Sequence, residues 1–169
     1  MPKKETQDLE RFLAPYPGRV QEIALWLREF IWDLYPDCNE LIYDNYNAVA
    51  FGLSPSDRAG DVFVSIAVSS NHVNFGFNRG SALHDPEKIL LGKGSLYRFI
   101  RVKTQDDFLK TYMKKLLKEA HANSMMRLKE KKQVLKGKTI VKSISPVKKR
   151  PDKNGKRVIT GKKKTKSRK

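Results

Sequence analysis

Residues 62–77 read VFVSIAVSSNHVNFGF, two runs of alternating apolar and small or polar side chains around a short polar break. The alternating apolar positions are Val62, Val64, Ile66, Val68, Val73, Phe75 and Phe77. A period of two places them on one face of a strand, and the break at Ser70 and Asn71 suits a tight turn. The stretch therefore predicts an antiparallel hairpin with one buried face.

Helices and further strands are predicted around this hairpin. Apolar residues recur at three- and four-residue steps between Arg19 and Leu34, which is typical of an amphipathic helix. A second helix is predicted after Thr104, ending near residue 122 or extending to about residue 132. Residues 41–53 and Leu96–Val102 are each predicted as one strand. Together these elements predict an α+β fold, a single antiparallel sheet of about four to six strands packed against N- and C-terminal helices.

The charge of the chain divides it into two parts. The 169 residues contain 35 Lys and Arg against 18 Asp and Glu, a net charge of +17. Residues 1–122 hold sixteen basic and sixteen acidic side chains, and residues 123–169 hold nineteen basic and two acidic ones. The C-terminal part has no aromatic residue, so little apolar surface offsets the entropy of ordering it. We expect a domain at residues 1–122 and a basic, largely disordered tail at residues 123–169.

Clusters of basic residues in this tail indicate a polyanionic partner. The candidate nucleic-acid contacts are Lys148, Lys149, Arg150, Lys156, Arg157, Lys162, Lys163, Lys164, Lys166, Arg168 and Lys169. An extended cationic chain neutralises phosphates and releases counterions, so we expect association with DNA or RNA without sequence preference. The alternatives are a purely solubilising tail, or one that binds acidic lipid or an acidic protein.

Five short segments occur in order in the neutral part of the chain. They are ELIYDNYNA at 40–48, SSNHVNFGF at 69–77, RGSALHDP at 79–86, GKG at 92–94 and RFIRV at 98–102. Together they resemble the YdhG-like domain of unknown function family over about residues 18–120. The resemblance implies a compact α+β domain similar to frataxin, and some members of that family are described as iron chaperones.

An iron-binding chaperone is therefore one alternative function. Iron on a frataxin-like surface needs clustered oxygen ligands, and acidic residues are available on and after the first helix. These are Glu22, Glu29, Asp33, Asp37 and Glu40. They do not form a dense acidic ridge, and the ordinary interpretation is a solvated helix face. We therefore assign no metal ligands and expect no resident cofactor, with iron possible under this alternative.

A small polar pocket is the other alternative. Parity along the fourth strand places Arg98 among inward-facing apolar residues, where it needs an acceptor, and Asp44 is the candidate. The predicted pocket consists of Asp44, Tyr46, Asn47 and Arg98, with Arg79 and Gly80 at its mouth. Under this alternative the protein is a binder for a small anionic ligand, or an enzyme that acts on one. The competing interpretation is a buried ion pair that fixes the register of the sheet.

Catalytic and compartment signals are weak. His72, His84 and His121 have no companions at metal or triad spacing, so we expect a non-enzymatic binding protein. Cys38 is the single cysteine, which excludes an intramolecular disulfide and favours a reducing compartment. The sequence contains neither an apolar run of signal-peptide type nor one long enough to span a membrane, so we expect a cytoplasmic location.

Overall fold

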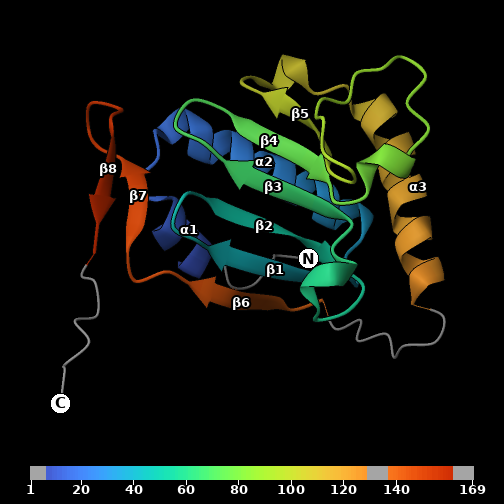
Figure 1. Cartoon of the computed structure of the whole chain (residues 1–169), viewed down its shortest axis with the longest axis horizontal. Helices are drawn as coiled ribbons and strands as arrows, with labels where there is room; N and C mark the ends of the chain where they lie inside the picture. Colours follow the sequence, from blue (N-terminus) through green and yellow to red (C-terminus); the bar gives the residue numbers. More distant parts are fainter. Residues whose placement is uncertain (1–6, 129–136, 162–169) are drawn as a thin grey trace.

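The structure is a computed structural model that describes residues 7–128 and 137–161. The helices are α1 (Gln7–Leu13), α2 (Gly18–Leu34) and α3 (Lys110–Arg127), with 3-10 turns at η1 (Ala59–Asp61), η2 (Gly80–Ala82) and η3 (Gln105–Asp107). The strands are β1 (Asn39–Asp44), β2 (Val49–Ser54), β3 (Val64–Val68), β4 (Val73–Phe77), β5 (Arg98–Val102), β6 (Thr139–Ile144), β7 (Lys148–Pro151) and β8 (Arg157–Thr160). The predicted α+β class is confirmed (Figure 1).

Six strands form the main sheet, in the order β5-β4-β3-β2-β1-β6. Every neighbouring pair is antiparallel except β1 and β6, which run parallel. The predicted hairpin at residues 62–77 forms β3 and β4, with Ile66 opposite Phe75 and Val68 opposite Val73. A separate two-stranded sheet, β7 and β8, lies at the end of the main sheet opposite α3 (Figure 1).

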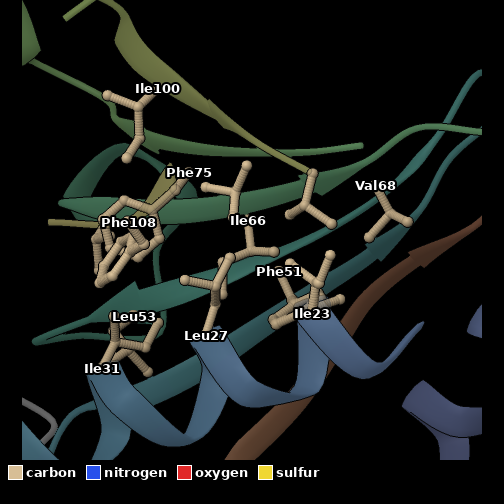
Figure 2. Close-up of a cluster of buried hydrophobic side chains, with 14 of the residues drawn as sticks. Ile23, Leu27, Ile31, Phe51, Leu53, Ile66, Val68, Phe75, Ile100 and Phe108 are labelled. Carbon is tan, nitrogen blue, oxygen red and sulfur yellow. The ribbon is translucent and has the colours of Figure 1, made fainter. Parts of the chain in front are cut away.

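The core lies between α2 and one face of the sheet. Ile23, Leu27 and Ile31 of α2 point toward side chains from β2, β3 and β4, as Figure 2 shows. Phe51, Ile66 and Phe75 meet them there and are essentially inaccessible to solvent. The helical period of α2 and the strand period of residues 64–77 therefore supply the two matching apolar surfaces.

The helix at the C-terminal side begins later than the sequence predicts. Asp107 accepts hydrogen bonds from the backbone N–H groups of Lys103 and Thr104, but these lie at η3, and α3 begins at Lys110. Its buried residues include Met113, Leu116 and Leu117, part of the predicted apolar stripe. The helix runs through residue 122 to Arg127, and the suggested extension over residues 129–132 lies outside the described residues.

The prediction of one strand at residues 41–53 is wrong. The chain reverses there, because the Asn45 N–H donates to the Ala48 carbonyl at 3.1 Å and closes a turn between β1 and β2. The polar residues in the middle of this run belong to that turn and its approach. Polar side chains and a tight reversal go together because a turn leaves backbone groups for local hydrogen bonds.

The prediction that the C-terminal part lacks structure is wrong for residues 137–161. β6 adds to the exposed edge of β1, and hydrogen bonds from Glu40 N–H to the Lys138 carbonyl and from Ser145 N–H to the Asp44 carbonyl flank the pairing. The low apolar content of this segment predicts disorder only if side-chain burial is the sole source of order. Main-chain hydrogen bonds to a strand edge require no aromatic residue, so a basic segment can be ordered by them.

A buried ion pair joins α2 to β1. Arg28 donates to both carboxylate oxygens of Glu40, at 2.6 and 2.7 Å, and the two residues are 2% and 0% exposed. The hydroxyl of Thr139 on β6 donates to the same carboxylate at 3.0 Å, and the Arg28 guanidinium lies over the Trp32 ring. A bidentate pair with further hydrogen bonds meets the requirements for keeping two charges out of water.

Replacing Arg28 with methionine should destabilise the protein strongly. The substitution leaves the Glu40 carboxylate buried without its cation, which typically costs about 3–5 kcal/mol. The double variant Arg28→Met, Glu40→Leu removes both charges and should recover most of that loss. Urea denaturation followed by circular dichroism measures both. A double variant as unstable as the sum of the two single variants would contradict this interpretation.

Candidate functional site

The C-terminal hairpin, which we define as residues 148–160, is the most strongly cationic structured element of the chain. Lys148 pairs with Thr160 and Arg150 with Val158 across β7 and β8. In the turn, one carboxylate oxygen of Asp152 accepts hydrogen bonds from the Asn154 and Lys156 N–H groups, each at 2.8 Å. The acidic side chain is thus used locally to shape the turn.

Arg150 anchors this hairpin to the sheet. It is 3% exposed and donates to the Asp44 carboxylate at 2.6 Å, the Asn45 carbonyl at 2.7 Å and the Tyr46 carbonyl at 3.0 Å. The ammonium of Lys148 contacts the other carboxylate oxygen of Asp44. The Lys149 N–H donates to the Tyr46 carbonyl at 2.7 Å. The β1–β2 turn therefore receives the hairpin through a buried carboxylate and several main-chain acceptors.

The charge of this region is strongly positive. Residues 137–161 carry the basic side chains Lys138, Lys142, Lys148, Lys149, Arg150, Lys153, Lys156 and Arg157. Asp152 is the acidic residue in the same stretch. Two of the cations share the single carboxylate of Asp44, while Lys153, Lys156 and Arg157 are exposed. The outer part of the hairpin therefore presents uncompensated positive charge to solvent.

The predicted tail contacts divide into three groups. Arg150 is buried and Lys148 is paired with Asp44, so these two act as anchors for the hairpin. Lys149, Lys156 and Arg157 are half-buried or exposed. The remaining candidates lie outside the described residues, namely Lys162, Lys163, Lys164, Lys166, Arg168 and Lys169.

The predicted pairing of Arg98 with Asp44 is wrong, and the six pocket residues do not come together. β2, β3 and β4 separate β1 from β5. Following the paired residues across the sheet from Asp44 leads to Val102 of β5. Arg98 is at the opposite end of β5, and the paired residues there lead to Glu40. Arg98 donates instead to the Gly94 and Tyr97 carbonyls. Alternation along a strand predicts on which face of the sheet a side chain lies, but not which residues of the other strands lie beside it.

The two halves of the predicted pocket have separate surroundings. Gly80 lies against Arg98, since a Cβ at Gly80 would be 2.5 Å from the Arg98 Cβ. Arg79 lines a small cavity with Phe63 and Arg127. Tyr46 and Asn47 remain with Asp44 in and beside the β1–β2 turn, where their carbonyls accept hydrogen bonds from Arg150 and Arg157.

The sequence did not indicate that Tyr16 contacts the start of β2, nor which residues pair with Asp44. Tyr16 lies in the segment between α1 and α2, is buried, and its hydroxyl accepts from the Val49 N–H. Burial raises its pKa, and the nearby charge of Arg150 opposes that rise. From the sequence alone, Asp44 is predicted to pair with Arg98, and Lys148-Lys149-Arg150 are predicted only as nucleic-acid contacts in a segment expected to lack structure. The one available signal was this cluster of basic residues, since a buried acid needs a cation.

Residues 7–128 and 137–161 contain no group of three or more His, Cys, Asp or Glu side chains that could hold a metal ion. Glu40, one of the acids considered for iron, is held by Arg28. None of the helices described has the length and apolar character needed to cross a bilayer.

Comparisons with known proteins give no relative: no family model, no curated protein and no solved structure matches the chain. The YdhG-like and frataxin-like resemblance therefore stays a prediction. What is known of the candidate site comes from its own geometry.

Replacing Asp44 with asparagine should loosen the hairpin. The variant keeps the size of the side chain but leaves Arg150 and Lys148 without their carboxylate, a loss of about 3–5 kcal/mol for a buried pair. Hydrogen exchange at the Lys149 and Ser145 amides should then accelerate on the order of a hundredfold or more. Asp57→Asn, at an exposed loop position, is the matched control. Unchanged protection in the Asp44 variant would show that the anchor lies elsewhere.

Proposed function

We propose that this chain is a non-enzymatic, YdhG-like binding domain whose C-terminal hairpin associates with nucleic acid without sequence preference. The observation that carries the proposal is the placement of Lys149, Lys153 and Lys156 on a hairpin that a buried Arg150 fixes to the sheet. A protein of this kind would act in the cytoplasm, where nucleic acid is accessible.

Shape and rigidity support this proposal. A two-stranded antiparallel ribbon is one of the elements that fit the major groove of a duplex. Anchoring by Arg150 and by the Lys149 N–H means that the cations need not be ordered from a free chain when they bind. Preorganised charge of this type binds more tightly than the same charge on an unstructured tail.

Composition indicates the mode of binding. Residues 137–161 contain no aromatic side chain, so base stacking of the single-strand type is not available from them. Lysine contacts to phosphate fix position and carry no sequence information. The expected interaction is therefore electrostatic, strong at low salt and indifferent to base sequence.

Neutralising the hairpin should weaken nucleic-acid binding and flatten its salt dependence. We propose the variant Lys149→Gln, Lys153→Gln, Lys156→Gln, measured by fluorescence anisotropy with duplex DNA and duplex RNA across a salt series. The slope of log K against log salt should fall by about 0.9 for each lysine that contacts a phosphate of B-DNA.

The matched control removes the same charge from another surface. Lys114, Lys115 and Lys118 lie on the exposed side of α3, and their replacement by glutamine changes the net charge equally. A third variant, Lys162→Gln, Lys163→Gln, Lys164→Gln, measures the contribution of the last residues in the full chain. If the hairpin and α3 variants lose the same affinity for nucleic acid, the effect is one of net charge alone and the proposal is overturned.

A further inference from the structure

A polar cavity lies where the hairpin meets the main sheet. Its volume is about 270 Å³. The residues that line it include Tyr16, Asn47, Ser69, Ser70, His72 and Arg157. They come from the α1–α2 link, the β1–β2 turn, the β3–β4 turn and β8, and Figure 1 places both turns and the hairpin at the same end of the sheet. Arg157 is the contribution of the C-terminal hairpin to the wall of this cavity.

Most of the residues that line this cavity carry a polar side chain. Arg157 supplies a guanidinium that also donates to the Asn47 carbonyl, and the side chains of Asn47, Ser69 and Ser70 add an amide and two hydroxyls. No described residue lining the cavity is acidic. The charge of Asp44 contributes to the raised pKa of Tyr16. Asp44 itself is buried and is paired with Lys148 and Arg150.

His72 adds a group whose charge responds to its surroundings. Its Nδ1 lies 2.6 Å from the Asn71 side-chain oxygen, so Nδ1 carries the proton and Nε2 becomes a second donor when the ring is protonated. Burial, followed by the charges of Arg101 and Lys103, holds the pKa of His72 below its ordinary value. Arg19 is also close, donating to the Asn71 and Lys103 carbonyls at 3.3 and 3.2 Å.

We propose that this cavity binds the phosphoryl group of a phosphomonoester. A guanidinium, an amide, two hydroxyls and an imidazole match the several oxygens and the negative charge of that group better than they match a single carboxylate. The cavity volume leaves room for the carbon skeleton that bears the phosphate. The proposal does not rest on nucleic-acid binding by the hairpin, although a terminal phosphate of a bound strand has the same chemistry.

The surrounding charges predict the sign of a pH effect. Burial, followed by the charges of Arg101 and Lys103, holds the pKa of His72 low, and burial raises the pKa of Tyr16. Arg19 and Arg157 are further cations on this side of the sheet. A bound dianion favours the imidazolium and raises the pKa of His72. Anion affinity should therefore rise as the pH falls through the titration of His72 and be weaker above it.

Titration calorimetry on the full chain tests the proposal with inorganic phosphate and with phenyl phosphate. Sulfate serves as a probe that stays dianionic over about pH 5–8, where histidine titrates. Arg157→Gln should weaken phosphate binding about tenfold or more, because it removes a charged donor. Lys118→Gln, which removes one charge from the exposed side of α3, should retain the affinity. His72→Gln should abolish the pH dependence of sulfate binding.

Two oligonucleotides of the same sequence, one with a 5′-phosphate and one with a 5′-hydroxyl, distinguish the source of the phosphoryl group. Tighter binding of phenyl phosphate than of either oligonucleotide identifies a free ester as the source. Tighter binding of the 5′-phosphate strand than of the 5′-hydroxyl strand identifies the end of a nucleic acid. Absence of saturable binding to every phosphoryl probe would overturn the proposal. Equal weakening of phosphate binding in the Arg157 and Lys118 variants would also overturn it. Loss of duplex binding by the hairpin lysine variant, with phosphate binding intact, separates this site from the proposed nucleic-acid surface.

Discussion

Two buried carboxylates on β1 hold the parts of this molecule together. Glu40 and Asp44 occupy the same face of one strand, four residues apart, and both are inaccessible to solvent. Glu40 binds Arg28 of α2 and Thr139 of β6, and Asp44 binds the basic residues of β7. Because an unpaired buried carboxylate is costly, each acid fixes its partners in place. β1 thereby connects the core helix to the C-terminal segment.

This arrangement gives the basic C-terminal segment a definite position. Lys148 and Arg150 neutralise Asp44 and anchor the hairpin. The other basic side chains of the hairpin face solvent or the polar cavity. The same docking that exposes a lysine surface also brings Arg157 against the β1–β2 and β3–β4 turns. Both proposed activities thus depend on one structural feature, the seating of the hairpin on Asp44, while using different residues.

The elements predicted best were those with strong periodicity. The alternation in residues 62–77 and the helical repeat after Arg19 each report burial of a continuous face, which local sequence encodes directly. The predicted contact between Arg98 and Asp44 is wrong, because alternation along a strand does not say which residues of the other strands lie beside a given residue. The order of the strands separates Arg98 from Asp44, and that order is a property of the whole chain.

By itself, the sequence determined the α+β class, the hairpin at the centre of the sheet, the apolar face of α2 and the concentration of positive charge after residue 122. Only the tertiary structure decided that β6, β7 and β8 form within the basic segment, that Asp44 pairs with Lys148 and Arg150, and that Tyr16, His72 and Arg157 share a cavity. The physical reason is the range of the interactions. Periodicity reports a local choice of face, whereas the pairing of β6 with β1 and the ion pairs of Asp44 join residues about a hundred positions apart.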